Sequence, residues 1–195
     1  MLIIGIDPGL DGAFALYDSE QRRVLEMISI PVLKLTKGKG TKREISPHTL
    51  LAMLRDQITG IYPSIDRAFI ERVQSSPQMG VTSAFNFGRG YGAVEGVIAS
   101  MGWAVEYVVP AKWKRFFALR PEKDEALQRA CQLLPLDTGL WLPQRGVVNQ
   151  QQCYGRAEAA LIAVYGAKML GSPEPKPTPV PVSGVLASAP PDMLL

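Results

Sequence analysis

The stretch that decides the fold is "LIIGIDPGLDGAFALYD", residues 2–18. An apolar segment ends in the carboxylate of Asp7, Pro-Gly follows, and a second apolar segment begins near residue 12. Apolar runs separated by Gly, Pro and Asp predict two strands joined by a short turn, which is an antiparallel hairpin. An unpaired carboxylate is costly in a core, so Asp7 needs a cation, hydrogen-bond donors or a metal. Asp7 is therefore the first candidate functional residue.

Further strands are predicted at about residues 23–30, at "RAFIERV" and at "AVEYVVP". The helices predicted from apolar spacing and from their start signals cover residues 46–58, 77–101, about 111–118, 122–134 and 155–170. Three strands linked by hairpins, followed by alternating helix and strand, predict a mixed α/β sheet with helices on its faces.

Two more carboxylates stand in apolar surroundings. Glu71 ends a predicted buried strand, and Glu158 lies in the last helix one turn before Leu161 and Ile162. If the strands of Asp7 and Glu71 are parallel neighbours, both carboxylates lie at the carboxyl edge of the sheet, where ligand sites of α/β proteins form. Carboxylates that converge there repel one another, and a hard divalent cation, Mg²⁺ or Mn²⁺, relieves the repulsion.

Each of these carboxylates also has a purely structural interpretation. Asp7 before Pro-Gly is typical of a residue that caps a turn. Glu71 has Arg67 and Arg72 close by in the sequence as partners for an ion pair. Glu158 is compatible with the solvent-facing side of a helix. The sequence alone leaves these alternatives open, and the hypothesis of a metal site rests on the three residues together.

Length and composition set the outer limits. The chain has 195 residues, and seven of its 16 prolines fall in residues 171–195, which predicts one domain over residues 1–170 and a disordered, Pro-rich tail. No apolar run is long enough to span a membrane, and the first residues do not resemble a secretory signal. The two cysteines, Cys131 and Cys153, form neither a disulfide framework nor a zinc motif, so we expect a cytoplasmic protein.

The net charge is only +3, but the cations are clustered. Residues 34–43 hold five cations and no acid, which fits either a solvated loop or a nucleic-acid contact. In "PAKWKRFF" the cations Lys112, Lys114 and Arg115 stand beside aromatic residues, and here a nucleic-acid contact is favoured.

Four segments, taken in order, resemble one family. They are "IIGIDPGLDGAFAL", "FIERV", the run from "SAFNFGRG" to "PAKWK", and "GRAEAALIAVYG". Together they look like the RuvC Holliday-junction resolvases, above all the phage-type members, over about residues 2–170. The resemblance implies a ribonuclease-H-like fold, with a mixed five-stranded sheet flanked by helices. It also implies a homodimer that uses Mg²⁺, or Mn²⁺ in its place, to cut four-way DNA junctions, with no small-molecule cofactor and no membrane.

The same resemblance assigns roles by position. Asp7, Glu71 and Glu158 match the family's catalytic metal ligands, with Asp7 between two ions and each glutamate holding one. The residues that match the DNA-contacting and nearby basic positions are Lys112, Lys114, Arg115 and Lys123.

The sequence departs from the family at two places. The family carries an acid or a histidine about one turn before its last acid, where this chain has Tyr154. Asp11 is a candidate to compensate for that loss. The aromatic wedge of the resolvases is replaced by Gln74, with only Met79 nearby as an apolar probe. The first departure supports an alternative function, that of a branched-DNA-binding protein with weak or no catalysis.

Other hypotheses are weaker. A sugar-kinase or actin-type ATPase shares the Gly-x-Asp-x-Gly start, but this chain is too short for two lobes and has no second phosphate-binding loop. A nuclease of the same fold that acts on RNA stays open. The glycine-rich helix predicted at residues 77–101 is the candidate dimer surface, because small residues permit close approach.

Overall fold

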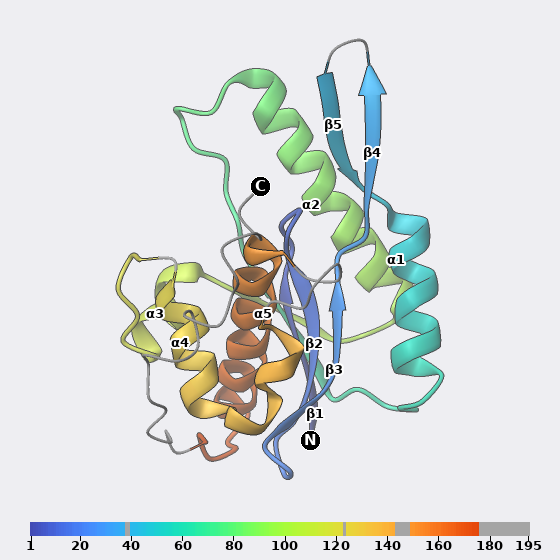
Figure 1. Cartoon of the computed structure of the whole chain (residues 1–195). Helices are drawn as coiled ribbons and strands as arrows, with labels where there is room; N and C mark the ends of the chain where they lie inside the picture. Colours follow the sequence, from blue (N-terminus) through green and yellow to red (C-terminus); the bar gives the residue numbers. More distant parts are fainter. Residues whose placement is uncertain (38–39, 123, 143–148, 176–195) are drawn as a thin grey trace.

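The computed structural model describes residues 1–37, 40–122, 124–142 and 149–175, and a five-stranded sheet forms its centre (Figure 1). The strands of this sheet are β1 (Leu2–Asp7), β2 (Ala13–Asp18), β3 (Arg23–Ser29), β6 (Arg67–Glu71) and β7 (Val105–Val108). Their order is β3-β2-β1-β6-β7. The first three strands pair antiparallel, whereas β6 runs parallel to both β1 and β7. The mixed sheet predicted from the sequence is confirmed.

Helices cover both faces of the sheet (Figure 1). They are α1 (Pro47–Leu54), α2 (Val81–Met101), α3 (Pro110–Phe116), α4 (Asp124–Leu133) and α5 (Gln150–Met169). Alternate side chains of β1 enter two separate cores, because successive residues of a strand point to opposite faces. Ile3 packs with α3, α4 and α5, whereas Ile4 and Ile6 pack with α1 and α2.

Helix α5 lies unusually close to the sheet. A Cβ atom added at Gly5 of β1 would overlap the backbone of Ala159 and Ala163. Gly166 of α5 is likewise in contact with the ring of Phe69, a residue of β6. Small residues at these crossing points let the helix backbone approach β1, which sets the position of every side chain on this face of α5.

The basic segment, for which the sequence left a solvated loop or a nucleic-acid contact open, forms a β-hairpin and not a loop. Its strands, β4 (Val32–Lys37) and β5 (Gly40–Ile45), pair antiparallel and project beyond the main sheet (Figure 1). Val32 lies opposite Ile45 and Thr36 opposite Thr41, and such pairs of β-branched residues favour a hairpin. The loop interpretation was wrong because the many lysines and glycines hide this pairing.

Two helices begin at other residues than the sequence predicted. Helix α5 starts at Gln150, five residues before the expected start, because Asn149 and Gln152 form a capping box. Helix α2 starts at Val81, after Gly80, instead of at about residue 77. A short 3₁₀ helix, Pro135–Leu140, occupies part of the segment that was predicted as a loop.

The predicted tail, residues 171–195, lies outside the described residues from residue 176 onward, as does Lys123. Residues 171–175 follow α5 closely. The Ser172 N–H donates to the Ala167 carbonyl oxygen at 3.0 Å, and Glu174 forms an ion pair of 3.8 Å with Arg129. Among the described helices, none is both long and apolar enough to cross a membrane.

Candidate active site

Two carboxylates meet where β1 and β6 end. In this parallel pair Ile6 lies opposite Ile70, so the following residues, Asp7 and Glu71, are neighbours at the carboxyl edge of the sheet. Ile3, Gly5 and Asp7 alternate along β1 and share the face that α5 covers. The side-by-side placement predicted from the sequence is therefore confirmed.

Glu158 of α5 completes the group. One carboxylate oxygen from each of Asp7, Glu71 and Glu158 lies within 4.8 Å of the others. Glu71 is only 7% exposed, whereas Asp7 and Glu158 are partly buried. We call these three residues the carboxylate cluster. Glu158 adjoins Ala159, which rests directly on Gly5, so the tight packing of α5 on β1 carries Glu158 to the strand ends.

Each member of the carboxylate cluster has one specific partner. The Gly9 N–H donates to Asp7 Oδ1 at 3.0 Å, and the Trp113 indole N–H donates to Glu71 Oε1 at 2.9 Å. Lys114 Nζ lies 3.1 Å from Glu158 Oε1. Asp7 thus caps the turn after β1, as its structural interpretation predicted, and also belongs to the cluster.

The partners of Glu71 and Glu158 differ from those that their structural interpretations require. Glu71 accepts from an indole and, among the described residues, forms no ion pair with Arg67 or Arg72, while Arg67 pairs with Glu106 at 3.4 Å. Glu158 is not a fully solvent-facing residue, because its side chain is only 24% exposed and forms an ion pair with Lys114.

Negative charge in the cluster is only partly compensated. Burial, together with the charges of Glu158 and Glu71, raises the pKa of Asp7 to about 7, although the Gly9 N–H and the Lys114 ammonium act in the opposite direction. Burial also raises the pKa of Glu71, against the hydrogen bond from Trp113. Carboxylates with raised pKa values in such a group favour the binding of an added cation.

The donor set fits a hard divalent metal. All three side chains offer oxygen, which Mg²⁺ and Mn²⁺ prefer, and the two strands and α5 bring these oxygens together. One ammonium, that of Lys114, already shares Glu158. Asp7, Glu71 and Glu158 are thus the residues that would hold such an ion.

Helix α3 supports the cluster from the side. Trp113 is fully buried, and the Lys114 ammonium lies 5.0 Å from the centre of its ring. Lys112 and Arg115 are exposed on the same helix, away from these contacts. Sequence reasoning placed Trp113 among the aromatics of a basic segment and missed its bond to Glu71, a residue 42 positions away.

Tyr154 stands where the resemblance predicts an acid or a histidine, and it contacts helix α4. Tyr154 lies one turn before Glu158, and its hydroxyl donates to Asp124 Oδ1 of α4 at 2.6 Å. Asp11 does not compensate, because it forms an ion pair with Arg43 at 2.7 Å and lies outside the carboxylate cluster. Among the described residues, the cluster therefore has three carboxylates.

The solved structures that resemble this one include two of RuvC. The T. thermophilus RuvC in complex with a Holliday junction substrate has a TM-score of 0.51 and 16% identity, and the match covers 90% of this chain and 99% of that one. A second Thermus thermophilus RuvC structure has a TM-score of 0.45 and 17% identity over the same shares. No protein-family model matches the sequence, and no curated protein does. The arrangement of strands and helices, together with the first match, shows that the chain has the RuvC-like, ribonuclease-H-like fold.

Proposed function

We propose that the protein is a Mg²⁺-dependent endonuclease that cuts branched DNA such as four-way junctions. The observation that carries this proposal is the carboxylate cluster at the strand ends of a RuvC-like sheet. The similar T. thermophilus protein was solved with a Holliday junction, which supports branched DNA as the substrate class.

Different side chains of the site would bind the metal, orient Glu71 and attract the phosphate. Bound Mg²⁺ or Mn²⁺ would activate water and stabilise the leaving oxygen of a phosphodiester. Asp7, Glu71 and Glu158 would hold the metal, and Trp113 keeps the carboxylate of Glu71 in one orientation. The ammonium of Lys114 lies beside the cluster and is placed to attract a phosphate oxygen.

Exposed cations support an anionic partner. Lys112 and Arg115 are exposed on α3, next to the residues that hold the cluster. On another side of the site, Lys42 is exposed on the β4–β5 hairpin. Contacts of this kind bind phosphates without reading sequence, so binding should weaken steeply as salt is added.

The direct test is a nicking assay on a synthetic four-way junction and on a linear duplex of the same sequence. We expect nicks in the junction with Mg²⁺ or Mn²⁺, none in EDTA, and little cutting of the duplex. Glu158→Gln should lower the rate at least about 100-fold, because the amide is a poorer metal ligand. The control is Asp56→Asn, which changes an exposed carboxylate in the short π-helix Arg55–Thr59 that follows α1. This variant should cut the junction as fast as wild type. An inactive wild type, or an active Glu158→Gln, contradicts the proposal.

Trp113→Phe should weaken metal binding. The substitution keeps an aromatic ring but removes the N–H that orients Glu71, and the loss of such a supporting bond lowers metal affinity about 10-fold. Titration calorimetry with Mn²⁺ on DNA-free protein measures this directly, without any nicking.

The chain offers a matched control in Trp141→Phe. Trp141 is also fully buried, and its indole N–H donates to Cys131 Sγ at 3.4 Å instead of to a cluster residue. Both variants should lose a similar stability, about 1–3 kcal/mol, through the smaller ring. Equal Mn²⁺ affinity in the two variants would show that Trp113 has only a packing role.

A branched-DNA-binding protein with weak or no catalysis is the second candidate function. Two observations favour it: Tyr154 occupies the position of an expected acid, and Lys114 already neutralises part of Glu158. Such a protein binds a four-way junction equally well in EDTA and in Mg²⁺, and does not nick it.

Tyr154→Asp separates the two functions. A new carboxylate one turn before Glu158 should lower the Mg²⁺ concentration needed for half-maximal nicking, roughly 10-fold. The measurement is the nicking rate across a Mg²⁺ titration. Cleavage that begins only in the variant identifies the natural protein as a binder, and an unchanged titration shows that position 154 does not reach the metal.

We also infer a homodimer formed through the outer face of α2. Val81 and Phe85 are 88% and 68% exposed there, and Cβ atoms added at Gly88 and Gly92 would meet nothing within 4 Å. A second copy of the helix would cover these apolar and small residues. Sedimentation equilibrium should show a dimer at micromolar concentration, and a monomer there contradicts the inference.

A further inference from the structure

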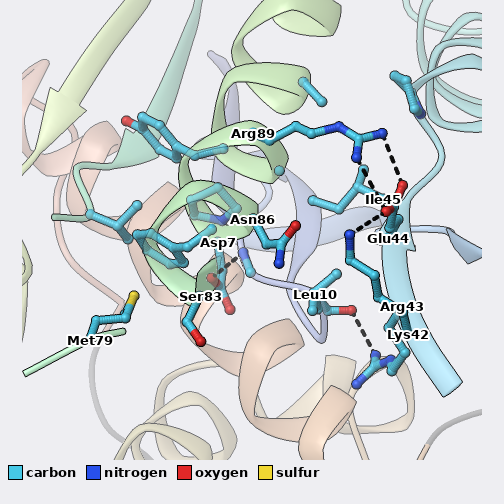
Figure 2. Close-up of a pocket in the computed structure, with 18 residues that line it drawn as sticks. Asp7, Leu10, Lys42, Arg43, Glu44, Ile45, Met79, Ser83, Asn86 and Arg89 are labelled. Carbon is cyan, nitrogen blue, oxygen red and sulfur yellow. Dashed lines mark hydrogen bonds and ion pairs between the residues drawn. The ribbon is translucent and has the colours of Figure 1, made fainter. Parts of the chain in front are cut away.

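A cavity of about 520 Å³ adjoins the carboxylate cluster (Figure 2). It lies between α2, the base of the β4–β5 hairpin and the turn after β1. Asp7 belongs both to its lining and to the cluster. The volume is typical of sites for small organic groups, about 300–1,000 Å³. A group bound in this cavity would therefore be a direct neighbour of whatever the cluster holds.

The lining combines flat apolar groups with a few polar atoms. Phe87 and Tyr91 contribute aromatic rings, and Met79 adds an apolar side chain. Figure 2 shows Ser83 and Asn86 beside Asp7. Within the described part of the chain, neither the Ser83 hydroxyl nor the Asn86 amide has a hydrogen-bond partner of its own. Aromatic rings with free amide and hydroxyl groups are the means by which proteins bind unstacked bases.

Fixed cations stand at the hairpin side of the cavity. Lys42 and Arg89 both form ion pairs with Glu44, at 2.7 and 2.9 Å. Arg43 is held by Asp11 and by the Leu10 carbonyl oxygen, to which it donates at 3.1 Å. Lys42 and Arg89 thus share the single carboxylate of Glu44, which leaves one positive charge in excess at this side of the cavity. This balance suits an anionic strand that passes the cavity while one of its bases enters.

We propose that the cavity receives one unstacked base of the DNA strand whose phosphate lies at the carboxylate cluster. The inference rests on the proposed nuclease function and adds how a branch is recognised. Removing a base from the stack is cheapest where pairing is already interrupted, as at a branch point. The cavity thus favours branched over linear DNA without base-specific contacts in a groove. The Asn86 amide adds a preference for adenine, whose edge matches an amide.

The test combines a changed substrate with a changed cavity. Four-way junctions carry a single abasic nucleotide at each position near the nicked phosphate in turn. For wild-type protein, one position should lower kcat/KM about 10-fold, which corresponds to the loss of one base stacked on an aromatic ring. Gly90→Leu should cause the same loss on the intact junction. Gly90 lines the cavity, and a Cβ added there would lie 3.5 Å from Ile45 Cδ1, an ordinary contact. The rest of the leucine side chain would then fill the cavity and exclude the base.

The losses of kcat/KM caused by the abasic nucleotide and by Gly90→Leu should not be additive. On the abasic junction Gly90→Leu should cut as fast as wild type, because no base is left to exclude. The control Ser100→Leu adds the same side chain at an exposed position of α2 outside the lining and should behave as wild type on both junctions. Fully additive losses, or no sensitive abasic position, overturn the proposal.

Two further measurements make the result decisive. Junction Kd values in EDTA, for the same proteins and substrates, should show the same pattern without nicking, so an inactive nuclease is distinguished from an unused cavity. Thermal unfolding checks that Gly90→Leu folds, and Asn86→Ala provides a second variant that favours the helix. With Asn86→Ala, rates for adenine and for the other bases at the sensitive position should become equal. An adenine preference that survives this variant contradicts the role of Asn86.

Discussion

Asp7→Asn should abolish nicking and at the same time raise the thermal stability of the metal-free protein at neutral pH. The loss of activity, at least about 1,000-fold, follows because the central ligand of the carboxylate cluster becomes a neutral amide. The gain in stability follows because burial and two neighbouring carboxylates make the ionised side chain costly in the folded state. The amide oxygen of asparagine can still accept from the Gly9 N–H, as Asp7 Oδ1 does at 3.0 Å.

The pH dependence has a definite sign. The folded-state pKa of Asp7 is about 7, above its ordinary value of 3.8. Wild-type protein therefore loses stability as the pH rises from about 4 to 7, because the unfolded chain ionises first. Asp7→Asn should match wild type below about pH 4 and exceed it above about pH 7, by about 2 kcal/mol or about 4–8 °C in Tm. Scanning calorimetry in EDTA across this range measures both values.

Added Mg²⁺ should make the wild-type protein more stable than Asp7→Asn, which reverses their order in EDTA. Binding to the folded state stabilises wild type, whereas Asp7→Asn, with a weakened site, should gain little. Asp56→Asn, at an exposed position, should follow wild type in every condition. A variant that is less stable than wild type at pH 8 in EDTA would falsify the view that Asp7 carries uncompensated charge.

Gly5→Ala should be among the most destabilising substitutions in the chain. Its Cβ would overlap the Ala159 carbonyl oxygen and the Ala163 nitrogen, which are backbone atoms of α5 and cannot rotate away, and it would come within 2.8 Å of Ala163 Cβ. Overpacking of this kind costs about 3 kcal/mol or more, or about 6–12 °C in Tm. If α5 moves outward to relieve the overlap, Glu158 leaves the carboxylate cluster and Mn²⁺ binding weakens as well.

Gly96→Ala is the matched control. An added Cβ at Gly96 meets nothing within 4 Å, and alanine favours a helix over glycine by about 0.8–1 kcal/mol. Chemical denaturation should therefore show a small gain for Gly96→Ala and a large loss for Gly5→Ala. Similar stabilities for the two variants would show that α5 does not depend on close contact with β1.

Local pattern explains why the sheet and the cluster could be predicted. Asp7 and Glu71 each stand at the end of an apolar run in the sequence. The parallel pairing of their strands, which the residues alone left as a condition, is observed in the structure. Glu158 stands out because its neighbours in α5 are apolar. The hairpin Val32–Ile45 was not predicted, because cross-strand pairs stabilise it while its composition is typical of a loop.

The sequence by itself determined which residues carry charge at the ends of buried strands, because alternation and turn signals act over a few neighbouring positions. Only the tertiary structure decided what surrounds them. It placed the Trp113 indole on Glu71 and the Lys114 ammonium on Glu158. It also paired Arg43 with Asp11 and formed a cavity beside Asp7. These contacts join segments far apart in the chain, and they depend on how closely α5 packs on Gly5 and how α2 lies along the hairpin. No short-range pattern encodes such distances, so the chemistry of the carboxylates could be anticipated but not their partners.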